Sequence, residues 1–205
     1  VYDKKRTSST KWINAIGQYM PIVEWLRGHT ALKKHVVKPM LTNSEMYTCE
    51  DEEAVYVLSA FIDGYTIGSS PLKLGQVNEI AKILGTLHRS TEDLPAHLMK
   101  QLPRENFDIG FCRSLYKFIK NDLVSKHDAV LRIVKPFAGY LLDNIKRMKY
   151  VAETLKKKPK HYVLCHGDLH YWNMIQSKHI KLIDWECANL APPEQDLILH
   201  IAGQN

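Results

Sequence analysis

Apolar residues at helical spacing alternate with short apolar runs along this chain, and the pattern predicts a mixed α and β protein. A helical stripe covers residues 11–27, and Pro21 within it is expected to kink or divide the helix. Residues 54–61 carry the strongest strand pattern of the first third, which Asp63-Gly64 ends. Residues 76–89 form a clear amphipathic stripe and predict a second helix. Weaker strand patterns lie at residues 1–3, 35–41 and 46–49.

Helical spacing dominates the middle of the chain, and strand patterns return in its last third. Residues 107–155 are predicted to be helical, with interruptions at residues 121–127 and at Lys135-Pro136. Two short apolar runs follow, at residues 162–165 and 180–183, and each leads into a polar loop. We interpret both runs as short buried strands.

The loops after these two runs each carry a carboxylate. His166-Gly167-Asp168 follows the first run, Asn173 lies five residues beyond Asp168, and Asp184 directly follows the second run. Since both loops follow buried strands, we expect Asp168 and Asp184 to lie close together at one mouth of the fold. Two carboxylates and an amide are oxygen ligands of the kind that Mg²⁺ takes. Phosphoryl transfer uses such a set, with Asp168 accepting the proton of the attacking hydroxyl and Asn173 and Asp184 holding the metal.

Composition and charge narrow the class of protein. The chain has 205 residues, of which 45% are hydrophobic and 24% charged, and these proportions are typical of a soluble globular protein. No apolar run approaches the length of a membrane span, and no signal peptide is visible, so we expect no membrane partner and a cytoplasmic location. The net charge of +6 suits an anionic nucleotide. Its basic runs lack interleaved aromatic residues, so we expect no nucleic-acid partner.

The four cysteines are widely spaced and contain no Cys-x-x-Cys motif, which predicts reduced thiols. A zinc site is a minor alternative, because its residues lack the spacing of a structural zinc motif. Its ligands would be Cys165, His166, His170 and Cys187.

Two motifs give a resemblance to a known family. His-Gly-Asp-x-x-x-x-Asn at residues 166–173, followed by Ile-Asp-Trp-Glu at residues 183–186, resembles the aminoglycoside phosphotransferase family of the protein-kinase-like superfamily. Residues 190–197 are similar to the spectinomycin phosphotransferase branch. The resemblance implies an α+β, protein-kinase-like fold with a β-containing N-lobe and a mostly helical C-lobe that carries a catalytic β-hairpin. We therefore expect a partial N-lobe at residues 1–60 and the C-lobe at residues 61–205.

The resemblance also implies an enzyme that moves the γ-phosphate of Mg-ATP to a hydroxyl of a small molecule. In the family, a hinge strand that ends in an acidic-Gly pair contacts the adenine through its backbone, and Asp63-Gly64 is that pair here. The carried-over nucleotide contacts are Ala60, Phe61 and Ile62, with the Ala60 carbonyl and the Ile62 N–H as bonding groups. Ile183 resembles the apolar floor under the adenine ring.

Five further residues match family positions with supporting roles. Glu24 is a candidate partner for a strand lysine, and Glu186 is either a third metal ligand or a support for the first two. We expect His166 to fix the catalytic loop by hydrogen bonding, and Asp196 to tie the last helix to that loop. His88 is expected to be a packed structural histidine.

The sequence departs from the family at two places. The phosphate-binding hairpin and the strand lysine would precede residues 1–3, and helices of the acceptor pocket would follow the apolar helix start at residues 194–202, so we expect a fragment of a kinase-like enzyme. The best acceptor by resemblance is spectinomycin or a related aminocyclitol. Alternatives are a metabolic small-molecule kinase (choline, methylthioribose, homoserine or sugar type) and a non-catalytic nucleotide-binding protein. A further one is a metal-dependent hydrolase that uses His166, Asp168, His170 and Asp184.

Overall fold

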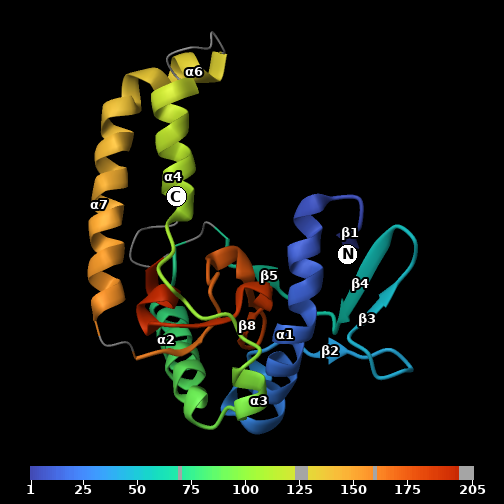
Figure 1. Ribbon diagram of the computed structural model, residues 1–205. Coiled ribbons are helices and arrows are strands. Elements are labelled where there is room, and N and C mark those ends of the chain that lie inside the picture. Colours follow the sequence, from blue (N-terminus) through green and yellow to red (C-terminus); the bar gives the residue numbers. More distant parts are fainter. Residues whose placement is uncertain (69–70, 123–128, 159–160, 199–205) are drawn as a thin grey trace. The chain divides into compact units, whose positions relative to one another are not determined.

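The computed structural model describes residues 1–68, 71–122, 129–158 and 161–198 (Figure 1). The chain forms two compact units. Unit 1 comprises Val1–Arg104 together with His161–Asn205, and unit 2 comprises Glu105–Lys160. The expected lobe boundary between residues 60 and 61 falls inside unit 1, and that division stays a prediction.

A small antiparallel sheet in unit 1 is built around β4 (Ala54–Ser59), the strand that the sequence predicts most strongly. Val55 of β4 lies opposite both Tyr2 and Glu50, so two strands flank β4 on its two edges. β4 ends two residues before the predicted end, and the N–H of Ala60 then donates to the Lys38 carbonyl at 2.8 Å. The partner strands are β1 (Tyr2–Asp3), β2 (Pro39–Met40) and β3 (Thr48–Glu50).

The first predicted helix is α1 (Thr7–His29), and it runs through Pro21 without a break. Of the two predicted effects of Pro21, a division of the helix is therefore wrong, and a kink stays a prediction. Proline crowds the carbonyl four residues earlier, which here belongs to Gly17, and a glycine lets that peptide shift most easily. The helix ends at His29, and the hydroxyl of the next residue, Thr30, donates to the Leu26 carbonyl at 2.6 Å. A 3₁₀ turn at Ala31–Lys34 follows.

The second predicted helix is α2 (Leu74–Arg89), whose buried stripe consists of Ile80, Ile83, Leu84 and Leu87. It packs into the same core as the inner face of α1, where Ile22, Val23 and Leu26 are buried. A 3₁₀ turn at Ser90–Glu92 and a short helix, α3 (Ala96–Met99), lie in the segment that follows α2.

The two apolar runs of the last third form strands in different sheets. β6 (Val163–Cys165) pairs with β9 (Asn189–Ala191). β8 (Ile180–Leu182) instead forms a hairpin with β7 (Met174–Gln176), and β5 (Tyr65–Thr66) adds a third strand beside β7. Met174, Ile180 and Leu182 are fully buried, so one face of this hairpin completes the core of unit 1.

Unit 2 is helical and has a core of its own around Cys112, Ile119 and Ile145. Its elements are α4 (Gly110–Lys117), a π-helical turn at Phe118–Asp122, α6 (Ala129–Val134), a 3₁₀ turn at Lys135–Phe137 and α7 (Ala138–Lys157). α4 and α7 lie side by side (Figure 1). The predicted interruption at Lys135-Pro136 is confirmed, whereas most of the one at residues 121–127 lies outside the described residues.

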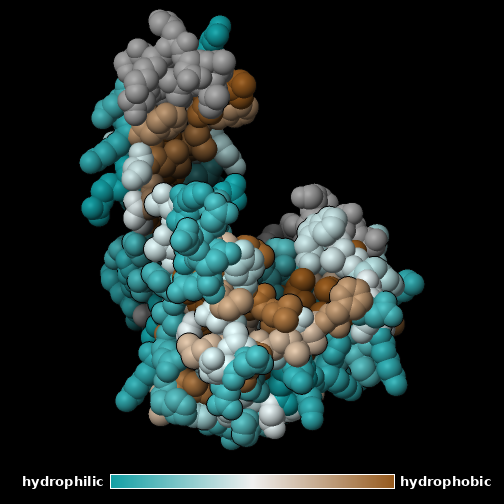
Figure 2. Space-filling model, turned by 90° about the vertical axis from the view of Figure 1, so that its right-hand side faces the viewer, coloured by the Kyte–Doolittle hydropathy of each residue, from teal (hydrophilic) through white to brown (hydrophobic). Residues whose placement is uncertain are grey.

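Apolar side chains also reach the surface of both units (Figure 2). In unit 2, Phe111, Ile133 and Phe137 are exposed, and in unit 1 so are Phe61 and Trp172. Among the described residues, no helix is both long enough and apolar enough to cross a membrane.

Gly64 is a point of close backbone approach between the segment after β4 and the hairpin of β7 and β8. A Cβ at this position would overlap the carbonyl oxygen of Gln176 and would lie 2.9 Å from Cγ2 of Ile175. We expect Gly64→Ala to lower the free energy of unfolding by about 1–3 kcal/mol, because one of the two segments must shift to admit the methyl group. Urea unfolding followed by circular dichroism measures this change.

Gly85→Ala is the matched control for this substitution. Gly85 lies within α2, and no atom lies within 4 Å of a Cβ added there. Alanine is preferred over glycine inside a helix, so this variant should gain about 0.5–1 kcal/mol. An unfolding midpoint of Gly64→Ala equal to or above that of the wild type would contradict the close approach.

Candidate functional site

The loop after β6 brings Asp168 and Asn173 together. A 3₁₀ turn at Tyr171–Asn173 follows His170 and places the Asn173 side chain back over the loop. The Asn173 Nδ2 atom donates to the Asp168 backbone carbonyl at 2.9 Å and lies 3.3 Å from Asp168 Oδ2. Because the amide nitrogen is engaged in this way, the amide oxygen is the Asn173 atom that can act as a ligand.

Asp184 follows β8 in a backbone conformation that few residues other than glycine adopt. Its φ and ψ are 63° and 63°, in the left-handed region, directly before a 3₁₀ turn at Trp185–Cys187. Such strain persists only where the surroundings impose it, and it is concentrated at functional sites. The surrounding structure therefore holds Asp184 in a less favourable backbone conformation, and this conformation sets the direction of its side chain.

Three carboxylates gather at this place. Desolvation, and after it the negative charges of Glu186 and Asp168, raise the pKa of Asp184 above its ordinary value. The two predicted carboxylates are therefore within electrostatic reach of each other, and Glu186 joins them. A cluster of like charges of this kind is relieved when a cation binds.

Buried contacts hold the two carboxylate-bearing loops against each other. The ring of His166 is fully buried, lies 4.6 Å from the Trp185 ring and has its Nε2 atom 2.9 Å from the Ile183 carbonyl oxygen. Burial lowers the pKa of His166, so the ring is neutral and donates from Nε2 to that carbonyl. Gly167 has a φ of +82°, and a Cβ there would overlap the carbonyl oxygen of Cys187. The expected hydrogen-bonding role of His166 is confirmed.

Asp196 anchors the loop that follows β6. Its carboxylate is buried, and it accepts hydrogen bonds from the backbone N–H groups of His166 at 3.1 Å and Gly167 at 2.9 Å. The Nε2 atom of His88, on α2, lies 3.0 Å from the same carboxylate. The expected link between Asp196 and this loop is confirmed, and His88 is part of it. Asp196 lies in a 3₁₀ turn at Pro193–Leu197, and most of the helix predicted at residues 194–202 lies outside the described residues.

The four residues of the alternative zinc site do not come together as a group of possible metal ligands. Among the described residues, His88, Cys165 and Asp196 form the group whose candidate ligand atoms lie within 4.8 Å of one another, and His166, His170 and Cys187 do not join it. The oxygens of Asp196 already accept from backbone amides, so this group is explained as a hydrogen-bonded anchor.

The predicted nucleotide contacts lie on the segment after β4. The Ala60 N–H is used by the sheet, but no hydrogen bond to another described residue occupies the Ala60 carbonyl or the Ile62 N–H. The side chain of Phe61 is 92% exposed. Ile183 is half-buried, and its N–H donates to the Asn173 carbonyl at 3.1 Å.

Sequence reasoning missed Ile175, which shares a hairpin face with Ile183. Strand alternation puts both residues on the face opposite Met174 and Leu182, and both are half-buried. The signal was present in the sequence, because Ile175 lies two residues after Asn173 in a short apolar strand. An apolar surface of two isoleucines therefore adjoins the carboxylate cluster.

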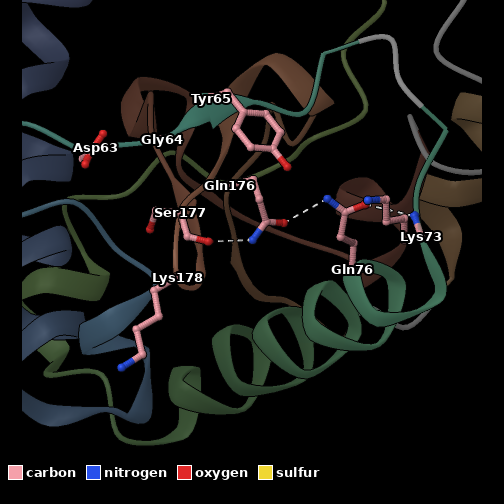
Figure 3. A pocket seen from close by; sticks show the side chains of 8 residues that line it. All are labelled: Asp63, Gly64, Tyr65, Lys73, Gln76, Gln176, Ser177 and Lys178. Carbon is pink, nitrogen blue, oxygen red and sulfur yellow. Dashed lines mark hydrogen bonds between the residues drawn. The ribbon is translucent and has the colours of Figure 1, made fainter.

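A polar pocket of about 540 Å³ lies beside the tip of the hairpin (Figure 3). Gln76 Nε2 donates to Gln176 Oε1 at 2.9 Å, and Gln176 Nε2 donates to the Ser177 carbonyl at 2.9 Å, so these amides satisfy one another. Asp168, Asn173 and Asp184 do not line this pocket. The lining residues are Asp63, Gly64, Tyr65, Lys73, Gln76, Gln176, Ser177 and Lys178.

Glu24, the candidate partner of a strand lysine, is exposed and accepts a hydrogen bond from the hydroxyl of Tyr47. Two tyrosines instead meet the carboxylate cluster. The hydroxyl of Tyr2 donates to Glu186 Oε2 at 2.7 Å, and Tyr19 interacts with Tyr2. Neither contact has a local signal in the sequence, since Tyr19 sits in an apolar helical stripe and Tyr2 lies 184 positions from Glu186.

Comparison with known proteins adds a family and a fold. Residues 11–204 match the phosphotransferase enzyme family. Protein StrN of Streptomyces griseus is 26% identical over 153 residues, which cover 68% of this chain and 46% of StrN. The chain therefore spans about half the length of this curated relative.

Solved structures share the fold. A spectinomycin phosphotransferase, APH(9)-Ia, in complex with ADP and spectinomycin, superimposes with a TM-score of 0.64 at 20% identity, covering 96% of this chain and 58% of that one. A GDP and kanamycin complex of an APH(2'') enzyme gives 0.62 at 17% identity, with coverages of 98% and 65%. An ethanolamine kinase of Plasmodium vivax gives 0.54 at 21% identity, with coverages of 89% and 49%. These likenesses confirm the predicted α+β, protein-kinase-like fold.

The raised pKa of Asp184 gives a prediction for stability. A carboxylate whose folded-state pKa is raised destabilises the fold once the pH exceeds that pKa, and has no such effect below the ordinary aspartate value of about 3.9. Asn keeps the shape of Asp and tolerates the left-handed conformation. Because Asp184 is exposed, solvent screens part of the repulsion, and Asp184→Asn should raise the melting temperature at pH 7 by about 1 °C. Thermal unfolding without divalent cations, from pH 3.5 to pH 7, measures the difference.

The gain should shrink towards zero as the pH falls through the raised pKa. Asp93→Asn is the matched control, because Asp93 is exposed and lies outside the carboxylate cluster. A lower melting temperature for Asp184→Asn at pH 7, or a gain of equal size at pH 3.5, would contradict the repulsion described above.

Proposed function

The chain belongs to the phosphotransferase enzyme family, and from this premise we propose that it transfers the γ-phosphate of Mg-ATP to a hydroxyl group of a small molecule. The main observation behind this proposal is that the loop after β6 and the loop after β8, which belong to different sheets, both place carboxylates in one cluster. Asn173 bonds to Asp168 in the first loop, and the charge of Asp168 reaches Asp184 in the second. This is the set of groups that phosphoryl transfer to an alcohol requires.

The residues present fit a magnesium ion. The donor set is an amide oxygen of Asn173 and a carboxylate of Asp184, which are hard oxygen ligands of the type Mg²⁺ prefers. The amide nitrogen of Asn173 is turned towards Asp168, which leaves the amide oxygen as a possible ligand. Desolvation and then neighbouring negative charge raise the pKa of Asp184, and a bound cation would offset that charge. When bound, Mg²⁺ would hold the nucleotide phosphates and neutralise the charge that develops on them.

Asp168 has the role of catalytic base in this proposal. Its side chain is 40% exposed, so an acceptor hydroxyl can approach it, while Asn173 holds its backbone in place. Asp168 orients the hydroxyl and accepts its proton as the oxygen attacks the γ-phosphate. His170 Nε2 lies 3.5 Å from Asp168 Oδ2 and borders the same approach.

The nucleotide would lie between the segment after β4 and the outer face of the hairpin. The Ala60 carbonyl and the Ile62 N–H offer an acceptor and a donor for the edge of the adenine, and Phe61 separates them in the chain. Ile183 and Ile175 offer an apolar surface for the ring. The support is chemical, since a purine needs both an edge partner and an apolar face.

The acceptor that we propose is an aminocyclitol or aminoglycoside such as spectinomycin, which would make the protein an antibiotic-modifying enzyme. The support is the likeness to APH(9)-Ia, solved with spectinomycin, and to an APH(2'') enzyme solved with kanamycin. The second candidate is a metabolic kinase of a small amino alcohol, and the likeness to an ethanolamine kinase favours it. A cytoplasmic location stays a prediction.

Acceptor-dependent release of ADP tests the proposal. The full-length protein is incubated with Mg-ATP and, separately, with spectinomycin, kanamycin, choline, ethanolamine, methylthioribose and homoserine. We expect one class of acceptor to stimulate ADP release, and Asp168→Asn to lower kcat by about 10²- to 10⁴-fold, because the hydroxyl then loses its proton acceptor.

Asp93→Asn serves as the control in the same assay, since Asp93 is exposed and distant in sequence from both loops. It should keep the wild-type rate. Undiminished acceptor-dependent turnover in Asp168→Asn would contradict the assignment of the base, and nucleotide binding without any acceptor-dependent release would favour a non-catalytic nucleotide-binding protein.

A further inference from the structure

Tyr2 connects the first strand of the chain to the loop that carries Asp184. It lies in β1, opposite Val55 of β4, and its hydroxyl donates to Glu186 Oε2 at 2.7 Å. Tyr2 and Glu186 are 184 positions apart in the chain, and both side chains are partly shielded from solvent. A hydrogen bond to a carboxylate in such a setting is stronger than one between neutral groups.

Tyr19 extends this contact to helix α1. Its side chain is buried, it interacts with Tyr2, and the charges of Glu186 and Asp184 both act on it. Side chains from α1 and β1 therefore meet beside Glu186.

Glu186, the acceptor of the bond from Tyr2, lies beside the proposed metal ligands. Glu186 is two residues after Asp184, and its charge is the largest electrostatic contribution to the raised pKa of Asp184. The orientation of the Glu186 side chain matters for this reason. In one orientation its carboxylate only repels Asp184, and in another the two carboxylates can share a cation. The bond from Tyr2 engages Oε2, and no hydrogen bond to another described residue engages Oε1 of Glu186.

We propose that Tyr2, supported by Tyr19, is a positioning residue that holds Glu186 and the Asp184 loop ready for the divalent cation. The inference rests on the proposed function, and it adds a contribution from β1 and α1 to cation binding. Groups that orient metal ligands from outside typically change metal affinity or activity by about 10- to 100-fold when they are removed.

Tyr2→Phe removes the hydroxyl and keeps the ring. We expect the Mg²⁺ concentration for half-maximal ADP release to rise about 10-fold, while kcat at saturating Mg²⁺ and the KM of the acceptor stay within about 2-fold of the wild type. The affinity for Mn²⁺ in the presence of ATP, measured by electron paramagnetic resonance, should fall by the same factor. Tyr19→Phe should shift both quantities in the same direction by a smaller factor.

Tyr56→Phe is the matched control. Tyr56 lies in β4 of the same sheet, and its hydroxyl donates to Asp51 Oδ2 at 2.9 Å, so this variant also loses a bond from a tyrosine to a carboxylate. It should leave the Mg²⁺ and Mn²⁺ dependence unchanged. In the Glu186→Gln background, Tyr2→Phe should add little further loss of Mn²⁺ affinity, because the two residues act as one unit.

The Mn²⁺ measurement does not need turnover, so it separates this inference from the proposed function. Weaker Mn²⁺ binding in Tyr2→Phe supports the inference, even where no acceptor in the panel is phosphorylated. Equal Mn²⁺ affinity in Tyr2→Phe and wild type overturns it, whatever the activity. A loss of kcat at every Mg²⁺ concentration with unchanged Mn²⁺ affinity would likewise overturn it and show a structural role alone. A wild-type protein that binds no Mn²⁺ with ATP overturns both.

Discussion

The buried carboxylate of Asp196 is the contact on which the arrangement of the site depends. It accepts the backbone N–H groups of His166 and Gly167 and faces the ring of His88, so it fixes the loop just before Asp168. Each buried N–H group left without a partner would cost about 1–3 kcal/mol. Gly167, whose N–H group this carboxylate holds, lies directly against the carbonyl of Cys187, so the anchor supports the contact between the two carboxylate-bearing loops.

Two unfavourable features meet at Asp184, a strained backbone and repulsion among carboxylates, and a bound cation would offset the repulsion. Asp184 combines a left-handed backbone with a pKa raised by desolvation and by two neighbouring carboxylates. The surrounding core compensates, because Met174, Ile180 and Leu182 are fully buried and hold the hairpin in place. The stability supplied by packing on one face of the hairpin thus allows the fold to tolerate repulsion between carboxylates at its end. Functional sites commonly depend on the surrounding core in this way.

The sequence predicted the main elements because each carries a local signal. The helical stripe of α2, the strand β4 and the two short apolar runs are visible in the spacing of apolar residues. Pro21 misled the prediction for α1, since the penalty for proline in a helix is outweighed by the buried side chains on both sides of it. The two apolar runs were expected to end at one mouth, yet they belong to different sheets, and His166 and Trp185 join their loops.

The sequence by itself determined the chemistry that is available: which carboxylates, amides and apolar strands exist, and their order along the chain. These follow from residue type and from spacing over a few residues. Only the tertiary structure decided that Glu24 bonds to Tyr47 and that Tyr2 bonds to Glu186. Contacts between residues 184 positions apart leave no trace in local periodicity, because their partners are chosen by the packing of α1 and the sheets around one core.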